Sequence, residues 1–441
     1  MESLLHFIWQ NRLFYPADIF TTTGSPVEII NPGLLNTNAG PDFLCAIVNI
    51  NGTQWAGNVE IHVDGDDWYR HNHHKDKAYS NVILHVVQHP SKSLATDANG
   101  RQIPEIILQY PQEITSRFSS LSSSHSSIRC REIIPGLSQL DRVSWLDRLL
   151  VERMQQRTER VLSINAECNG DWEQTLFVMI ARAIGEGVNG DALQDVARRS
   201  PLKIMQKMAS VEQIEALLFG RAGLLDNDTD DDYMCRLQRE YELLRARFDL
   251  PTPQTRVELR RLRLRPRSFP TVRIAQLAAI LFASHGNLSA SFATLNIKVL
   301  QQALNVQASD YWCWHYDFSK RESHIDPKLL GSNTRNRILI NGIIPWLYTR
   351  AHIAGNTREK ENILKMLEFM KPEKNHLITE WTDCGIKPAN EAEATALIHL
   401  SKYYCAPRRC LLCRFGQKLL SLQPISNSTE CKNINTSTPL S

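Results

Sequence analysis

The stretch "GPDFLCAIVNINGTQWAGNVEIH", residues 40–62, places two apolar runs on either side of Asn51-Gly52. Asn-Gly tolerates the positive φ angles of a type I′ turn, so the two runs predict an antiparallel hairpin. Asp42 stands at the start of the first predicted strand and Glu60 near the end of the second. Because antiparallel pairing joins these two ends, we expect both carboxylates at one end of a sheet.

His62 completes a candidate site at this end of the hairpin. It follows Glu60 by two residues, and side chains two apart on a strand share a face, so Asp42, Glu60 and His62 are predicted to converge. Two carboxylates with water suit Mg²⁺, or Mn²⁺ in its place, and such an ion can activate a water for attack on phosphorus. The alternative is that Asp42 caps a loop, Glu60 pairs with a surface lysine and His62 is an ordinary strand residue.

The segments around the hairpin predict further elements of a mixed fold. A helix is expected over 3–14 and a short strand over 26–31. The polar segment 66–79 is expected to begin a helix capped by Asp66, and the apolar run 81–88 predicts a buried strand. The predicted order is therefore helix, three strands, helix, strand.

This order, together with Pro41-Asp42 and the Glu-x-His of the second strand, resembles the core of the PD-(D/E)xK nuclease superfamily. The resemblance implies that Asp42 and Glu60 hold the metal ion. It also implies that His62 takes the place of the usual lysine beside the attacking water and the scissile phosphate. Histidine is neutral or charged according to its surroundings, so it would act as a base or leave the site inactive.

A histidine-rich segment follows the hairpin. Arg70, His71 and His73 are candidates for gripping phosphate on the substrate side of the site. A competing interpretation is a zinc site formed by His71, His73 and His85, because zinc prefers imidazole ligands. The remaining alternative is a solvated polar helix followed by a core strand with a hydrogen-bonded His85, and for His74 this alternative is favoured.

The rest of the chain predicts a large helical region. From residue 138 onward, apolar residues recur at helical spacing, and seven serines crowd the segment 119–130. We predict an α+β protein with an N-terminal αβββαβ restriction-endonuclease-like core followed by a large all-α domain. The expected parts are a nuclease-like domain at 1–115, a Ser-rich linker or loop at 116–137, a helical domain at 138–384, a C-terminal helix and cysteine motif at 385–420, and a disordered tail at 421–441.

An arginine-rich stretch in the helical region is a candidate nucleic-acid contact. The overall net charge is only +3, so any surface that binds nucleic acid must be local. The guanidinium fork donates two parallel hydrogen bonds to phosphate. The candidates are Arg260, Arg261, Arg263 and Arg265. The alternative is an ordinary arginine-rich surface paired with acidic segments such as 226–233.

Three cysteines near the C-terminus follow the pattern C-x4-C-x2-C and are Cys405, Cys410 and Cys413. Thiolates at this spacing can supply three ligands of a Zn²⁺ site or an iron–sulfur cluster. Cys384 is the nearest fourth ligand in the sequence, with Cys130, Cys313 or a histidine as alternatives. Buried cysteines without a metal are the competing interpretation.

Several longer blocks resemble an uncharacterised bacterial family, domain of unknown function 2851. They include "NAGPDF" (38–43), "GNVEIH" (57–62), "AYSNVILHVV" (78–87), "RLRPRSFPTVRIAQLAA" (263–279) and "YYCAPRRCLLCRFG" (403–416). This resemblance names a family and implies no activity.

The sequence therefore favours a metal-dependent nuclease that hydrolyses phosphodiester bonds in DNA or RNA. The alternative is a non-catalytic nucleic-acid-binding or scaffold protein with a structural zinc or iron–sulfur site, and a zinc hydrolase ranks third. The first fourteen residues carry polar and charged side chains where a signal peptide is apolar, and no run of about 18 apolar residues occurs. We expect a cytoplasmic protein without a membrane span.

Overall fold

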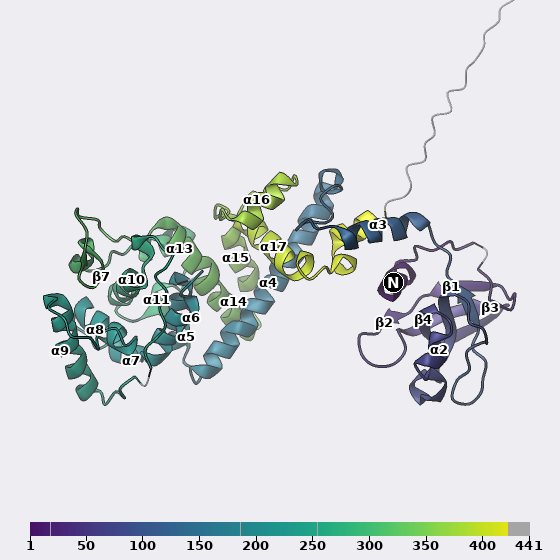
Figure 1. The fold of residues 1–441 in the computed structure, drawn as a ribbon, viewed down its shortest axis with the longest axis horizontal. Coiled ribbons are helices and arrows are strands. Elements are labelled where there is room, and N and C mark those ends of the chain that lie inside the picture. Colours follow the sequence, from purple (N-terminus) through teal and green to yellow (C-terminus); the bar gives the residue numbers. More distant parts are fainter. Residues whose placement is uncertain (18, 186, 254, 422–441) are drawn as a thin grey trace, which may run out of the picture. The chain divides into compact units, whose positions relative to one another are not determined.

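The computed structural model describes every residue except 18, 186, 254 and 422–441. The predicted tail, 421–441, lies outside the described residues apart from Ser421. The chain forms two compact units, one from Met1–Asp141 and the residues from Ser401 onward, the other from Arg142–Leu400. The first unit holds the main sheet and the second is mostly helical, which confirms the predicted mixed α/β character (Figure 1).

A six-stranded sheet forms the centre of the first unit. Its order is β1-β3-β4-β5-β6, and β2 pairs with β3. The strands are β1 Val27–Asn31, β2 Leu34–Leu35, β3 Phe43–Ile50, β4 Thr53–Asp64, β5 Val82–His89 and β6 Glu105–Ile107. The pairs β4–β5 and β5–β6 are parallel, whereas β1, β2 and β4 run antiparallel to β3.

The hairpin between β3 and β4 is the one predicted from Asn51-Gly52. Ile50 faces Thr53 across a two-residue turn, and Asn51 and Gly52 have φ angles of 52° and 81°. Positive φ at both positions is the requirement of a type I′ turn. The structure therefore confirms the hairpin and its local cause.

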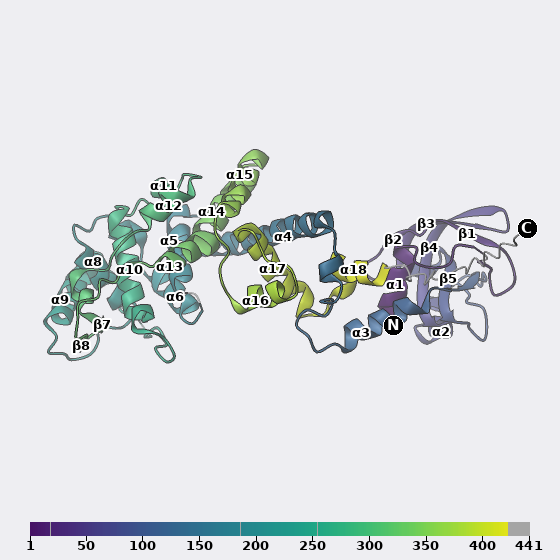
Figure 2. The same cartoon turned by 90° about the horizontal axis from the view of Figure 1, so that it is seen from above.

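Helix α1, Glu2–Gln10, lies against the sheet (Figure 2), and the side chains of its apolar face are buried. Leu4, Leu5, Ile8 and Trp9 are fully buried, and Trp9 Nε1 donates a hydrogen bond to Pro32 O at 2.9 Å. Burial of each large apolar side chain contributes about 1.5–3 kcal/mol. This packing fixes the position of the polar face of α1, which carries Glu2 and His6.

The crossover from β4 to β5 is less helical than expected. It consists of the four-residue helix α2, Asp67–Arg70, and two 3₁₀ turns, His73–Lys75 and Lys77–Tyr79. Asp66 precedes α2 but has helical backbone angles and makes no side-chain cap; its carboxylate accepts a hydrogen bond from Lys92 N instead. Trp68 anchors the crossover in a small core with Tyr79, Val82, Ala95 and Ile103.

The serine-rich segment and the C-terminal residues both belong to the first unit. Helix α3, Gln112–Ser123, extends into the first part of the segment 116–137 that was expected to be a linker or loop, and residues 124–133 form no helix or strand. Helix α18, Arg414–Ser421, contacts α3, and its Arg414 and Lys418 both pair with Asp141. The segment from Ser401 to Ser421 thus returns to the unit that contains α1 and the sheet.

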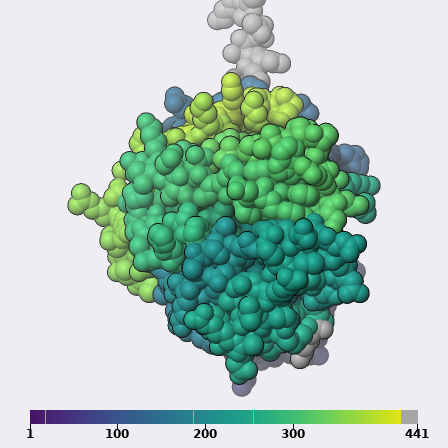
Figure 3. All heavy atoms as spheres, turned by 90° about the vertical axis from the view of Figure 1, so that its left-hand side faces the viewer, coloured from purple at the N-terminus to yellow at the C-terminus, as the bar shows by residue number. Residues whose placement is uncertain are grey.

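The second unit is built mainly from helices, one face of which is seen in Figure 3. They are α4 Gln139–Glu167, which starts just before the unit, α5 Trp172–Ile184, α6 Gly190–Arg199, α7 Leu202–Met205, α8 Val211–Arg221, α9 Asp232–Arg247, α10 Pro270–Ala283, α11 Leu288–Ser291, α12 Ile297–Ala303, α13 Ser332–Ile338, α14 Ile344–Ile353, α15 Thr357–Glu368, α16 His376–Asp383 and α17 Glu391–Leu400.

The expectation of an all-α region needs one correction. Strands β7, His315–Asp317, and β8, Lys320–Arg321, form a short hairpin within the second unit. Ser319 supplies a left-handed turn residue at a φ of 56° between them. None of the helices in the described residues combines the length and apolar character needed to cross a bilayer.

Candidate metal centre

Asp42 and Glu60 hold each other in place at adjacent ends of β3 and β4. The backbone N–H of Asp42 donates to Glu60 Oε2 at 3.0 Å, and the N–H of Ile61 donates to Asp42 Oδ2 at 2.9 Å. The Glu60 carboxylate is therefore held by the backbone of Asp42, and the Asp42 carboxylate by the backbone of the residue that follows Glu60. The hairpin brings the two acidic side chains together because the start of β3 and the last part of β4 lie at the same end of the sheet.

Helix α1 adds two residues that the sequence analysis missed. His6 Nε2 lies 3.2 Å from Asp42 Oδ2. Ligand atoms of Glu2, His6 and Asp42 all lie within 4.8 Å of one another, close enough to share one metal ion. Glu2 and His6 are four residues apart on one helix face, a spacing visible in the sequence. The sequence did not reveal that this face meets the end of β3.

A row of buried polar side chains crosses the sheet beside this pair. Glu60 of β4, His85 of β5 and Glu105 of β6 are register partners, and His62 lies two residues beyond Glu60 on the same face. Glu60, His62, His85 and Glu105 are all at most 5% exposed. Burying four polar side chains costs free energy unless each has a polar partner, so we expect these side chains to contact one another.

Those contacts form a chain from Glu105 through His85 to His62. His85 Nδ1 lies 3.2 Å from Glu105 Oε2, and His85 Nε2 lies 2.9 Å from His62 Nδ1. Burial raises the pKa of Glu105, but hydrogen bonds from His85 and Ser91 outweigh it and hold the pKa below the usual value. An ionised Glu105 favours the proton on His85 Nδ1, so His85 Nε2 accepts from His62 Nδ1–H.

The crossover contributes two more histidines to this face. The rings of His71 and His73 lie 5.2 and 5.4 Å from the ring of His62, and one nitrogen from each of the three lies within 4.8 Å of the others. The metal-competent histidine group is therefore His62, His71 and His73. The set predicted from the sequence, His71, His73 and His85, differs from this group. His85 is not a member of it, because His85 Nε2 is hydrogen-bonded to His62 Nδ1.

Glu60 links the two groups of candidate ligands. Its Oε2 accepts the hydrogen bond from Asp42 N, and its Oε1 lies 3.3 Å from His73 Nε2 and 3.6 Å from His62 Nε2. Burial and then the charge of Asp42 raise the pKa of Glu60 to about 9. Burial and then the neighbouring histidines lower the pKa of His62 to about 2. A nearby cation would stabilise the charged form of Glu60.

The predicted phosphate contacts differ in their partners. Arg70 pairs with Asp64 at 3.2 Å and also with Asp67, so its guanidinium is engaged by carboxylates. His71 is exposed beside the buried His73. In the second unit, Arg261 pairs with Asp317 through two hydrogen bonds. The side chains of three further arginines are exposed and have no carboxylate partner among the described residues: Arg260, Arg263 and Arg265.

The three C-terminal cysteines lie around two short helical turns of the first unit, Ser401–Cys405 and Cys410–Leu412. Arg129 Nη1 donates a hydrogen bond to Cys405 O at 2.8 Å, which brings Cys130 to this group. Burial, followed by the charges of Cys413, Cys130 and Cys410, raises the pKa of the Cys405 thiol.

Among the candidate fourth ligands, Cys130 acts on the charge of the Cys405 thiol and belongs to the same unit. Cys384, the predicted ligand, follows α16 in the second unit. Cys313 also belongs to the second unit, where its sulfur accepts a hydrogen bond from Gln307 Nε2. Sequence distance favoured Cys384, whereas the Arg129–Cys405 hydrogen bond and the effect of Cys130 on the Cys405 thiol favour Cys130.

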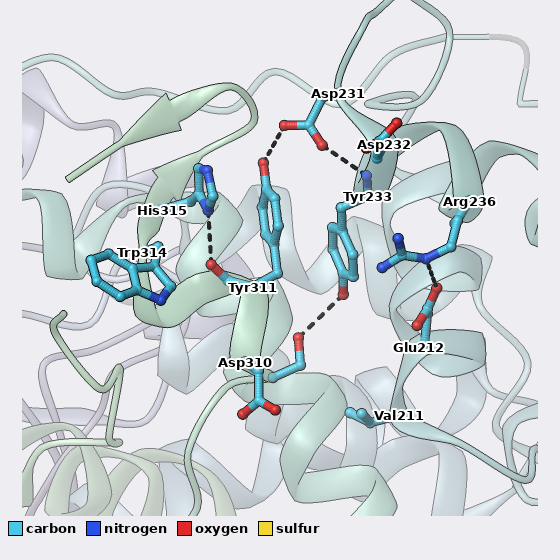
Figure 4. A pocket seen from close by; sticks show the side chains of 11 residues that line it. Val211, Glu212, Asp231, Asp232, Tyr233, Arg236, Asp310, Tyr311, Trp314 and His315 are labelled. Atoms are coloured by element: carbon cyan, nitrogen blue, oxygen red, sulfur yellow. Dashed lines mark hydrogen bonds and ion pairs between the residues drawn. The ribbon is translucent and has the colours of Figure 1, made fainter. Parts of the chain in front are cut away.

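A separate cavity of about 860 Å³ lies in the second unit, where aromatic rings are stacked (Figure 4). Tyr311 lies between Tyr233 and His315, with ring centroids 4.1 and 3.9 Å away. The Tyr311 hydroxyl donates to Asp231 at 2.5 Å, and the Tyr233 hydroxyl donates to Glu215. Both tyrosine hydroxyls are thus engaged by carboxylates, and we look for the candidate catalytic chemistry in the first unit.

A family model described as "Protein of unknown function (DUF2851)" matches residues 2–376. The chain belongs to this family. The match confirms the resemblance noted from the sequence blocks, and it includes the hairpin, the crossover and the arginine stretch of this DUF2851 protein. No curated protein and no solved structure matches the chain.

Proposed function

We propose that this protein is a metal-dependent nuclease of the PD-(D/E)xK type that hydrolyses phosphodiester bonds in DNA or RNA. The observation that carries the proposal is the reciprocal arrangement of Asp42 and Glu60 at adjacent ends of β3 and β4. The order α1-β1-β3-β4-α2-β5, with β2 and β6 added, supports a restriction-endonuclease-like core of αβββαβ type.

The donor set fits a hard divalent cation. Asp42 and Glu60 would hold Mg²⁺ or Mn²⁺, which are bound in proteins by one or two carboxylates with water. When bound, the ion supplies a Lewis acid for the phosphate and lowers the pKa of a water molecule. Asp42 and Glu60 orient this chemistry because Glu60 Oε2 is held by the N–H of Asp42 and Asp42 Oδ2 by the N–H of Ile61.

His62 fills the lysine position of the motif in a different chemical state. Its Nδ1 is hydrogen-bonded to His85, and burial keeps the ring neutral. A neutral imidazole offers a lone pair at Nε2 and no positive charge. In this proposal His62 therefore acts as a base or a ligand, and the positive charge that lysine usually brings to the scissile phosphate must come from another group.

Nucleic acid is the proposed partner, and the exposed arginines support it. Arg260, Arg263 and Arg265 have no carboxylate partner among the described residues. Such side chains can contact the phosphate backbone without reading sequence. Arg261 is held by Asp317, so we assign it mainly to positioning this stretch.

The cysteines support a structural metal site in the same unit. We propose that Cys130, Cys405, Cys410 and Cys413 bind Zn²⁺ or an iron–sulfur cluster, since four thiolates suit both. Such a site would tie the returning C-terminal segment to the region that follows α3. It would act on stability rather than on the reaction.

The nuclease proposal is tested by incubating the full chain with single- and double-stranded DNA and RNA in Mg²⁺, Mn²⁺ or EDTA. The double variant Asp42→Asn, Glu60→Gln should lose metal-dependent cleavage, whereas the exposed Glu28→Gln of β1 should keep it. If wild type and the double variant bind nucleic acid equally well and neither cleaves it, the nuclease proposal is refuted. A non-catalytic nucleic-acid-binding or scaffold role is then favoured.

A further inference from the structure

We infer that His62, His71 and His73 form a second metal position, adjacent to the Asp42–Glu60 pair, that takes a transition-metal ion such as Zn²⁺. One ring nitrogen from each histidine lies within 4.8 Å of the other two. The three come from two different segments, β4 and the β4–β5 crossover, so the fold rather than local sequence brings them together.

The hydrogen bonds of His62 leave one nitrogen for a ligand. Its Nδ1 is engaged by His85 Nε2 at 2.9 Å, and His85 is in turn 3.2 Å from Glu105. His62 Nε2 therefore keeps its lone pair, and it lies 3.6 Å from Glu60 Oε1, the oxygen that is also 3.3 Å from His73 Nε2. Metal-bound histidines in proteins commonly have their second ring nitrogen held in this way, because the outer partner fixes the tautomer and the ring orientation.

His73 is fixed in a similar manner by aromatic packing. Its ring stacks on Tyr79 with centroids 3.9 Å apart and meets the edge of Trp68 at 5.4 Å. His73 Nε2 is buried without a hydrogen-bond partner among the described residues, although Glu60 Oε1 lies 3.3 Å away. A buried acceptor in this state is costly, and a metal ion would satisfy it.

His71 gives the site its opening to solvent. Its side chain is exposed, whereas His62 and His73 are buried. One of the three imidazoles is therefore at the surface, where a metal ion can reach the group from solvent. Three protein ligands with a fourth open position are typical of catalytic rather than structural zinc sites.

The ligand set discriminates between metals. Imidazole suits Zn²⁺ and other late first-row ions, whereas Mg²⁺ prefers oxygen ligands. Glu60 contacts both candidate metal positions: its Oε2 accepts from Asp42 N–H, and its Oε1 lies 3.3 Å from His73 Nε2. A cation on the histidine side would provide the positive charge that a neutral His62 lacks. Metal binding at the histidines does not require the proposed nuclease activity.

The test is titration of the metal-free full chain with Co²⁺, which substitutes for Zn²⁺ and absorbs visible light when bound. Binding by nitrogen and oxygen ligands lacks the thiolate charge-transfer band that cysteine ligands would give, so the two sites are separable. We expect the affinity of this site to fall at least about 10-fold in His71→Ala and in His62→Gln. The neighbouring His74→Ala should match wild type, because His74 packs against Tyr69 outside the group.

Each outcome decides the inference. Equal Co²⁺ affinity in wild type, His71→Ala and well-folded His62→Gln would overturn it, as would binding that shows only the thiolate band. Circular dichroism checks that the buried His62→Gln variant is folded, and the exposed His71→Ala variant provides the same test without that risk. Asp42→Asn separates the two proposals: loss of cleavage in this variant with intact Co²⁺ binding would support both.

Discussion

The backbone N–H of Asp42 donates a hydrogen bond to Glu60 Oε2 at 3.0 Å across the ends of β3 and β4. The carboxylate of Glu60 is thereby fixed by an atom that no side-chain substitution at Asp42 removes. Conversely, Asp42 Oδ2 is fixed by the N–H of Ile61. Each acidic group can therefore be neutralised while the position of the other is kept.

Glu60→Gln is expected to remove catalysis with little change of structure. The amide oxygen can still accept from Asp42 N–H, but the variant loses the negative charge that we propose holds a divalent cation. We expect metal-dependent cleavage to fall at least about 100-fold. The measurement is initial rates in Mg²⁺ and Mn²⁺, with thermal unfolding as the check on folding. Unchanged rates would show that Glu60 is not a ligand.

Glu105→Gln is expected to weaken metal binding at His62, His71 and His73, although Glu105 is not one of the proposed ligands. The neutral amide no longer favours a proton on His85 Nδ1, so the tautomer that leaves His62 Nε2 free is less stabilised. Loss of an outer partner typically lowers metal affinity about 10- to 100-fold. Competition with a metal-binding dye measures this change. An affinity equal to wild type would mean that the Glu105–His85 contact serves packing alone.

Cys130→Ser is expected to lower the zinc or iron content of the purified protein. Cys130 lies with Cys405 through the Arg129 hydrogen bond, so its loss removes one of four proposed thiolates. Elemental analysis of protein purified without added metal gives the content, and the exposed Cys45→Ser serves as the control. The same content in both variants would return Cys130 to the role of a buried cysteine.

The sequence predicted the hairpin well because its causes are local. Asn51 and Gly52 determine the turn, and the turn determines which ends of the strands meet. Glu105 could not be recognised in this way, since β6 is three residues long and its pairing with β5 is parallel and non-local. The sequence marked His85 as a candidate zinc ligand, but only the pairing of β4 with β5 shows that its Nε2 is hydrogen-bonded to His62 Nδ1.

The same distinction explains the cysteine and helical regions. The spacing of Cys405, Cys410 and Cys413 is local, whereas their proximity to Cys130 depends on the return of the chain to its first unit. Helix α3 includes four of the seven serines that indicated a loop. There Ser123 Oγ bonds the carbonyl of Ser119 within the helix, and Ile114 and Leu121 are buried, so tertiary packing overrides serine's weak helix propensity.

The pH dependence of stability is expected to report on Glu215 of the second unit. Burial raises its pKa to about 7, so between its unfolded value near 4.5 and 7 the folded protein holds a proton that the unfolded chain releases. The free energy of unfolding should therefore decrease as pH rises through this window, by about 2–3 kcal/mol from this group. Urea denaturation at pH 5 and pH 8 measures it.

The variant Glu215→Gln isolates the contribution. An amide does not titrate, so the decrease between pH 5 and pH 8 should be smaller than in wild type. Glu391, whose pKa burial also raises to about 7, contributes equally to both proteins and cancels in the comparison. The exposed Glu258→Gln should leave the decrease unchanged. An identical decrease in Glu215→Gln and wild type would contradict the assignment.

The double variant Arg263→Ala, Arg265→Ala is expected to weaken binding to nucleic acid of any sequence. Both side chains are exposed without a carboxylate partner among the described residues, so their removal breaks no ion pair seen there. For each arginine that binds a phosphate, its removal should reduce the slope of log affinity against log salt by about 1. Arg261→Ala provides the contrast, because it leaves Asp317 without its partner and should lower stability first. Fluorescence anisotropy at several salt concentrations measures the slope; an unchanged slope in the double variant would exclude these two arginines from the binding surface.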